Sequence, residues 1–277
     1  MKKNKIFISL NNYTSPNTAA NYGVSLAKSL ERPAYLYGVQ RVPLTTDPVA
    51  ITGTGIPVPE TIIEVKKNTE KQLEKIYQDA LKIYPNVEFD VEIGFLETSL
   101  IEKTDEENPH IVVLEGNNEL TTLHEWFGTY ETRLAENIDM PVLVLPEETT
   151  WKPVKRIVYI MDMNDEKVNN MRFLTNLADK LNSNLAVVLL SNGNNKEEMD
   201  KYNEVVNIMR TLLEYKNVNF HQIFTEDSAE TIDKLLTRVN ADWLAFEHES
   251  SSFLERIFDN YNTKRLILQS EIPVLVF

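Results

Sequence analysis

The chain has 277 residues with 28 basic and 42 acidic side chains, a formal net charge of −14, and a hydrophobic share of 42%. This composition is typical of a folded globular chain long enough for two domains. It disfavours nucleic-acid backbones and anionic membrane surfaces as partners, because both attract basic proteins. The absence of cysteine excludes disulfides, zinc–thiolate sites and cysteine nucleophiles.

The amino terminus, MKKNKIFISL, has an apolar run too short for the core of a signal peptide. No apolar stretch approaches the roughly 20 residues of a membrane-spanning helix. We therefore expect a cytoplasmic protein that does not enter a membrane.

In the first half of the chain, short apolar runs alternate with segments whose apolar residues recur at helical spacing. Segment 43–59, with four prolines and two glycines, is expected to form a surface loop, with a lid over a ligand as the alternative. Strands are expected at 5–10, 34–42, 87–93, 111–114 and 141–145, and helices at 18–30, 61–84, 98–107 and 126–137.

The second half shows the same alternation with a shorter central insertion. Strands that alternate with helices favour a parallel sheet covered by helices. Strands are expected at 157–161, 185–190, 219–224, 243–246 and 273–277, and helices at 168–181, 196–215, 229–239 and 263–268.

The two halves repeat one pattern. Residues 109–145 align with 241–277 without a gap, and residues 5–12 align with 156–163. The hydrophobic pattern matches better than the identities do. The chain therefore reads as two copies of one α/β unit.

Few identities mark this alignment, among them Glu115 with Glu247 and the Pro-Val-Leu-Val that closes each half. Segment 146–153, PEETTWKP, has the polar and proline content of a linker. We predict one domain over residues 1–148 and a second over residues 149–277.

These patterns resemble the universal stress protein family, and the whole chain resembles a tandem, two-domain member. The likeness rests on the apolar first strand of each half, the 111–115 strand that enters a loop, Gly128-Thr129 before a helix, and the closing Pro-Val-Leu-Val strands. It implies an α/β fold of two repeated Rossmann-like (HUP-type) domains. Each would be a five-stranded parallel sheet with helices on both faces and a ligand over the carboxyl ends of its strands.

ATP-binding members of that family end the first strand with an acidic residue. Their phosphate loop reads Gly, two residues, Gly, nine residues, then Gly followed by Ser or Thr. In the first half Gly116, Gly128 and Thr129 fit this loop, but Glu119 replaces the middle glycine, the next spacer has eight residues, and Asn11 stands in place of the acid. A glutamate among amides that cradle a phosphate opposes the ligand.

The second half has the opposite defect. Asp162 supplies the acid, but His248, Ser251 and Asn260 occupy the positions of the glycines. The resemblance thus implies a degenerate nucleotide site built from Asn11, Gly116, Gly128, Thr129 and Asp162. No cofactor is expected, and ATP stays an open alternative.

Other side chains gather without a recognisable signature. Asp242, Glu247, His248 and Glu249 form the densest set of candidate metal ligands. Neighbours on an extended segment point to opposite sides and no second histidine is near, so solvated loop charges are favoured and no metal is expected. His124 lies near no nucleophile elbow, and no catalytic residue is expected.

The leading expectation is a tandem universal stress protein with a binding or regulatory role in stress response and no enzymatic activity. The alternative is an ATP- or AMP-binding member that uses one noncanonical site. A third hypothesis, a nucleotide-transferring enzyme, lacks a phosphate signature. The matched strands 141–145 (Pro141–Leu145) and 273–277 (Pro273–Phe277) would pair to form an intramolecular pseudo-dimer, and protein partners or higher oligomers stay open.

Overall fold

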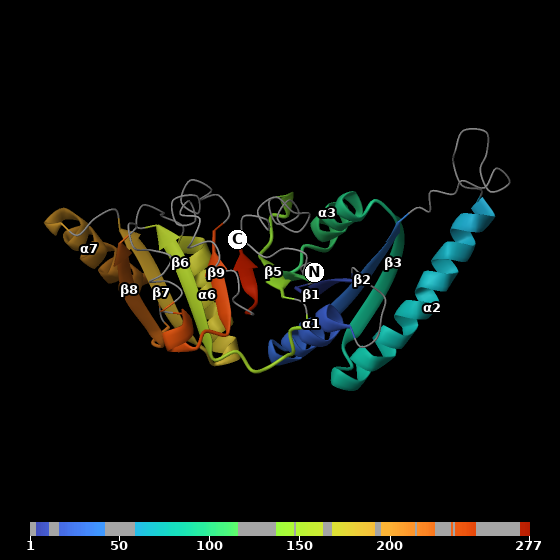
Figure 1. The fold of residues 1–277 in the computed structure, drawn as a ribbon, viewed down its shortest axis with the longest axis horizontal. Helices are drawn as coiled ribbons and strands as arrows, with labels where there is room; N and C mark the ends of the chain where they lie inside the picture. Colours follow the sequence, from blue (N-terminus) through green and yellow to red (C-terminus); the bar gives the residue numbers. More distant parts are fainter. Residues whose placement is uncertain are drawn as a thin grey trace. The chain divides into compact units, whose positions relative to one another are not determined.

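The computed structural model describes residues 4–10, 17–41, 59–115, 137–146, 148–162, 168–191, 195–213, 215–224, 234, 236–247 and 272–277. Figure 1 shows these residues as two successive α/β units. The expected fold class is confirmed: parallel strands alternate with helices in both repeats.

The first repeat has a parallel sheet in the order β3-β2-β1-β4, followed by β5. The strands β1 and β4 are buried along their whole length and are apolar except for Ser9 and Glu115. The strands are β1 (Ile6–Leu10), β2 (Ala34–Arg41), β3 (Val87–Gly94), β4 (Ile111–Glu115) and β5 (Val142–Leu145), and the helices are α1 (Thr18–Ser29), α2 (Pro59–Ile83) and α3 (Leu96–Glu107).

The second repeat has the same strand order, β8-β7-β6-β9-β10. Its strands are β6 (Arg156–Asp162), β7 (Asn184–Ser191), β8 (Val218–Phe224), β9 (Trp243–Phe246) and β10 (Val274–Val276), and its helices are α6 (Val168–Leu181) and α7 (Lys196–Leu212). Residues 236–239 are also helical.

Backbone hydrogen bonds at matched positions show that the repeat is structural as well as sequential. The amide of His110 donates to the carbonyl of Lys5 at 2.8 Å, and in the second repeat Asp242 donates to Arg156 at 2.9 Å. These four residues occupy equivalent positions in the alignment of the two halves. An equivalent backbone hydrogen bond therefore lies just before β4 in the first repeat and just before β9 in the second.

Helix ends also match between the repeats. Glu31 after α1 and Asn182 after α6 both have a positive φ, of 54° and 53°. In each case the next amide, from Arg32 or Ser183, bonds to the carbonyl five residues earlier. This is the hydrogen bond of a Schellman cap, formed here without the usual glycine in a chain that contains few glycines.

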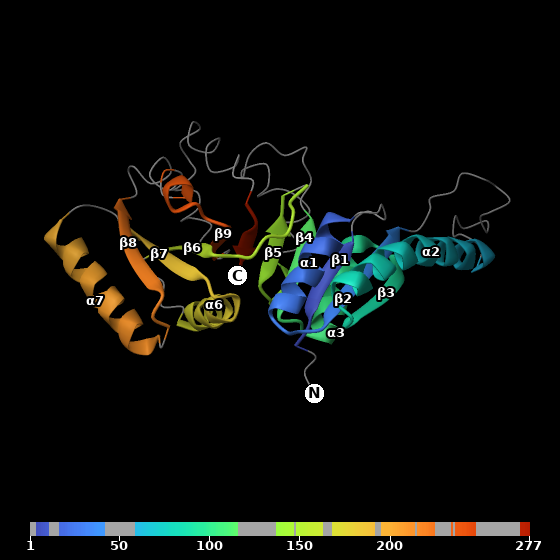
Figure 2. The same cartoon turned by 90° about the horizontal axis from the view of Figure 1, so that it is seen from below.

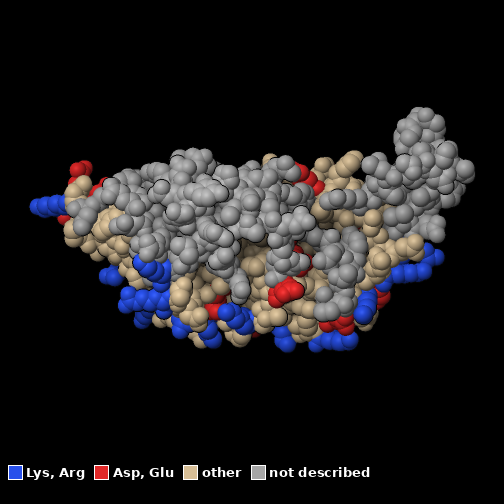
Figure 3. All heavy atoms as spheres, viewed as in Figure 1, with Lys and Arg blue, Asp and Glu red and all other residues tan. Residues whose placement is uncertain are grey.

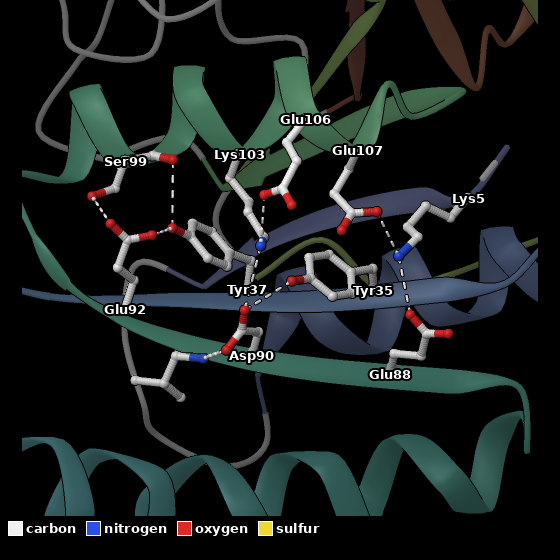
Figure 4. Close-up of polar contacts among 11 residues, drawn as sticks. Lys5, Tyr35, Tyr37, Glu88, Asp90, Glu92, Ser99, Lys103, Glu106 and Glu107 are labelled. Carbon is white, nitrogen blue, oxygen red and sulfur yellow. Dashed lines mark hydrogen bonds and ion pairs between the residues drawn. The ribbon is translucent and has the colours of Figure 1, made fainter. Parts of the chain in front are cut away.

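Helices cover both faces of the first sheet. Figure 2 shows α1 and α2 on one face, where they pack against each other, and α3 lies on the opposite side of β2 and β3 from α2 (Figure 4). Asn17 caps α1 by accepting a hydrogen bond from the amide of Ala20 at 2.9 Å. Gly23 lets this helix approach Ile8 of β1 closely.

Most expected elements agree with the structure to within one or two residues. Helix α7 is an exception, since it ends at Leu212 and not at residue 215. Leu213 is already extended, and the Tyr215 hydroxyl donates to the carbonyl of Ser183. The expected loop 43–58 and the expected helices at 126–136 and 263–268 lie outside the described residues.

The described chain forms two compact units. One contains the residues up to Glu115 together with Asn137–Val142, and the other contains the described residues from Leu143 onward. The proposed domain boundary between residues 148 and 149 stays a prediction. Among the described helices, none combines the length and apolarity that crossing a bilayer requires.

Candidate functional site

The carboxyl ends of the parallel strands are the natural place for a ligand in an open α/β sheet. Of the five residues predicted for a nucleotide site, the structure places one there. Asp162 is the last residue of β6 and pairs with Leu190 of β7. Asn11, Gly116, Gly128 and Thr129 lie outside the described residues.

A buried glutamate lies at the carboxyl end of β9. Glu247 follows the last residue of that strand and is 2% exposed. The hydroxyl of Tyr159, on β6, donates a hydrogen bond to its Oε1 atom at 2.5 Å, and Nδ2 of Asn170, in the first turn of α6, donates to the same atom at 3.1 Å. Two elements therefore fix the position of this carboxyl group.

The first repeat places a glutamate at the matched position. Glu115 is the last residue of β4 and is 7% exposed. Ile8 takes the place of Tyr159 in this repeat, so the hydroxyl that bonds to Glu247 has no counterpart. Both repeats nevertheless place a buried carboxyl group at the carboxyl end of their fourth strand, β4 in the first repeat and β9 in the second.

These carboxyl groups are chemically unlike a phosphate cradle. A carboxylate offers oxygen acceptors and negative charge, whereas a phosphate binds to donors and positive charge. The basic side chains visible among the described residues lie mostly toward the side of each unit where the strands begin (Figure 3). The described part of the site therefore suits a phosphate poorly.

The interpretation of Asp242 and Glu247 as solvated loop charges is wrong. Asp242 is 6% exposed and lies before β9, at the opposite end of the strand from Glu247. It accepts from the amides of Lys155 and Arg156 at 2.8 and 3.0 Å and forms an ion pair of 3.1 Å with Lys152. Asp242 thus anchors the start of β6.

No group of three or more histidine, aspartate or glutamate side chains among the described residues could hold a metal ion. The two described histidines resist protonation. Burial, assisted by the charge of Arg32, lowers the pKa of His110 to about 4, and burial also lowers the pKa of His221. His124 and His248 lie outside the described residues.

A groove of about 400 Å³ runs between α2 and β3. It is lined by Lys67, Glu70, Lys71, Glu74, Phe89, Asp90 and Val91. Charged side chains of both signs dominate its lining, whereas specific ligand sites are lined mainly by apolar groups with a few polar ones.

The sequence matches no protein-family model and no curated protein. Solved structures resemble it closely in fold. A universal stress protein from Archaeoglobus fulgidus superposes with a TM-score of 0.66 over 99% of this chain and 96% of that one, at 13% identity. The chain has the fold of the universal stress proteins.

A protein from Pseudomonas aeruginosa assigned to the same family gives a TM-score of 0.60 at 13% identity, over 99% of this chain and 92% of that one. The cytoplasmic domain of a prokaryotic cation chloride cotransporter gives 0.50 at 9% identity, over 100% of this chain and 95% of that one. A similar fold is thus found in a universal stress protein and in a domain of a transport protein, and the fold alone does not assign a function.

Two further structures match less than half of this chain, 46% and 45%, each with a TM-score of 0.33. They are universal stress proteins in complex with cAMP and with dAMP.

Proposed function

We propose that the chain is a tandem universal stress protein that works by binding or regulation, without catalysis, and that its strand ends do not hold a nucleotide triphosphate. The fold agrees over almost the whole length with a universal stress protein. The observation that carries the second part is the buried glutamate at the carboxyl end of β4 and of β9.

The geometry around Glu247 supports this reading. Because Tyr159 and Asn170 both donate to Oε1, the carboxyl group cannot turn away from the strand end without breaking two hydrogen bonds. A phosphate at this place would meet an acceptor held in position. Glu115 places a buried carboxyl group at the matched position of the first repeat.

The second candidate is an ATP- or AMP-binding protein that uses one noncanonical site. It is favoured by Gly116 and by Gly128-Thr129, which keep part of the family's phosphate loop in the first half. The replacement of the middle glycine by Glu119 argues against it.

We also propose that the two repeats associate through β5 and β10 as a pseudo-dimer inside a cytoplasmic chain. All four residues of β5 are buried, and Leu275 and Val276 of β10 are buried as well. Pairing of two matched apolar edge strands would protect their backbone groups from association with other molecules.

Thermal unfolding with and without Mg-ATP or AMP tests the proposed function. A ligand that binds only the folded state raises the melting temperature. We expect no rise with either nucleotide at about 1 mM, a concentration that would saturate a site of micromolar affinity. A reproducible rise would favour the second candidate, and release of phosphate above a protein-free control would contradict the absence of catalysis.

A further inference from the structure

Helix α3 is held on the first repeat more by polar groups than by apolar burial. Its buried side chains are Ser99, Leu100 and Thr104. Figure 4 shows a row of charged and hydroxyl groups beneath it, along β2 and β3. This row forms three clusters from the carboxyl end of the helix to its amino end.

The first cluster surrounds a buried lysine. Lys5, which precedes β1, is 1% exposed, and its Nζ atom lies 2.9 Å from Oε2 of Glu107 and 3.0 Å from Oε2 of Glu88. The same ammonium group lies 4.0 Å from the ring centre of Tyr35. Glu107 is itself 9% exposed, so this pair is shielded from water.

The second cluster connects the middle of α3 to β3. Nζ of Lys103 lies 3.6 Å from Asp90 and 3.0 Å from Glu106. Asp90 also accepts from the Tyr35 hydroxyl at 3.1 Å and from the amide of Val91 at 2.8 Å. One carboxylate thus ties α3, β2 and the outer strand together.

The third cluster fixes the start of α3. Glu92 accepts from the Ser99 hydroxyl at 3.1 Å and from the hydroxyl of Tyr37, which also contacts the Ser99 carbonyl at 3.4 Å. Burial, with the neighbouring carboxylates, raises the pKa of Tyr35 and Tyr37 well above the ordinary value. Both hydroxyls therefore remain donors.

The described strands of the second repeat carry no such row. The backbone registers of β2–β3 and β7–β8 correspond residue by residue. Ala186 and Val188 stand where the first repeat has Tyr35 and Tyr37, and Asn219, His221 and Ile223 stand where it has Glu88, Asp90 and Glu92. The exposed Arg156 replaces the buried Lys5. The fold therefore does not require this row.

A buried lysine depends on its partners. Loss of charge on its carboxylate partners leaves an uncompensated buried cation, which is strongly destabilising. A carboxylate next to a cation keeps its charge more firmly than an isolated one, so protonation of such a pair requires a pH below the ordinary range of about 4. The titratable groups that face one another across this interface are Lys5, Tyr35, Tyr37, Glu88, Asp90, Glu92, Lys103, Glu106 and Glu107.

We propose that α3 is an acid-sensitive latch, which leaves the first repeat when the carboxylates that face the buried Lys5 become protonated. Its release uncovers the stacked rings of Tyr35 and Tyr37, which pack on Phe7. Protonation of the carboxylates would thus expose an aromatic surface on the first repeat. This latch is independent of whether the strand ends bind a nucleotide.

Hydrogen–deuterium exchange of the full chain tests the latch, with each rate divided by the intrinsic rate at that pH. From pH 7 to about pH 3, we expect the protection of α3 to fall at least about tenfold, while that of α1 and α6 changes by less than about threefold. Lys5→Met removes the buried cation and keeps the length of the side chain, so it should abolish the acid response. Arg156→Met is the matched control in the second repeat and should leave the response intact.

Glu107→Gln provides a second test, because it removes a partner of Lys5 at neutral pH. We expect it to lower the protection of α3 at pH 7 toward the value that the unaltered chain has in acid. Unchanged protection of α3 in acid would overturn the proposal, as would an acid response that persists in Lys5→Met. Simultaneous loss of protection in α1 and α3 would also overturn it, since the whole repeat would then unfold.

Discussion

The hydroxyl of Tyr159 donates a hydrogen bond to Oε1 of Glu247 across 2.5 Å, between two side chains that are almost completely buried. The bond joins the middle of β6 to the end of β9. Because a buried carboxyl group that lacks donors is costly, this bond contributes to stability as well as to the shape of the strand end.

Tyr159→Phe removes this hydroxyl and leaves the hydrogen bond from Asn170 to Glu247 in place. We expect the free energy of unfolding, measured by urea denaturation, to fall by about 1–3 kcal/mol. Tyr202→Phe, at a half-buried tyrosine of α7, is the control and should change it by less than about 0.5 kcal/mol. Equal losses of unfolding free energy in the two variants would show that the hydrogen bond to Glu247 does not stabilise the fold.

Gly23→Ala tests the close packing of α1 on β1. A Cβ atom at this position would lie 2.5 Å from Cγ1 and 2.7 Å from Cδ1 of Ile8. Alanine normally stabilises a helix interior by up to about 1 kcal/mol relative to glycine, whereas overpacking costs about 1–3 kcal/mol. We therefore expect a net loss of stability in urea denaturation.

The matched experiment places Gly23→Ala on an Ile8→Ala background, which removes the obstructing atoms. There the substitution should be neutral or stabilising, and the two changes should couple in a double-mutant cycle. If Gly23→Ala stabilises the unaltered chain, the close approach does not constrain this helix.

His110 should make the stability of the first repeat depend on pH. Burial and the Arg32 charge lower its pKa in the folded state to about 4, while an unfolded histidine titrates near 6.5. Between about pH 4 and 6.5 the unfolded chain binds more protons, so this contribution to stability is present above 6.5 and is lost as the pH falls.

We expect His110→Gln to reduce the slope of the free energy of unfolding against pH within that window. Urea denaturation at several pH values measures the slope, with Lys28→Gln, on the exposed end of α1, as a control that changes charge without changing a histidine. Identical slopes for the unaltered chain and His110→Gln would contradict the assignment.

A fragment of residues 1–148 tests the proposed pairing of the repeats. Without the second repeat, the apolar edge of β5 should associate with other copies, since unpaired strand edges attract further strands. Light scattering should report a mass above that of one fragment, while the full chain does not associate through this edge. A soluble fragment that stays monomeric would count against pairing through β5 and β10.

Much of the fold could be predicted because its signals are local. The helical spacing of apolar residues gives α6 its observed bounds of 168 and 181, and the apolar run Trp243–Phe246 gives β9. The end of α7 could not be predicted in this way. There the backbone turns extended at Leu213, and a contact from Tyr215 to a residue 32 positions earlier accompanies the change.

The buried glutamates could not be recognised from local sequence. Glu247 stands in a charged stretch that is typical of a solvated loop, and its donors Tyr159 and Asn170 are 88 and 77 residues away in sequence. The internal repeat, however, contained a signal that these two glutamates have a structural role. Glu115 and Glu247 are among the few identities of the internal repeat, and each follows a buried apolar strand.

The central claim is that these two glutamates keep nucleotides from the strand ends. The most direct measurement is calorimetric titration of the full chain with Mg-ATP, beside the double variant Glu115→Gln/Glu247→Gln, which removes the negative charges and keeps the size of the side chains. We predict no saturable binding to the unaltered chain up to about 1 mM ATP, and measurable binding after the double substitution. Saturable binding to the unaltered chain with a Kd below about 100 μM, unchanged by the double substitution, would contradict the account.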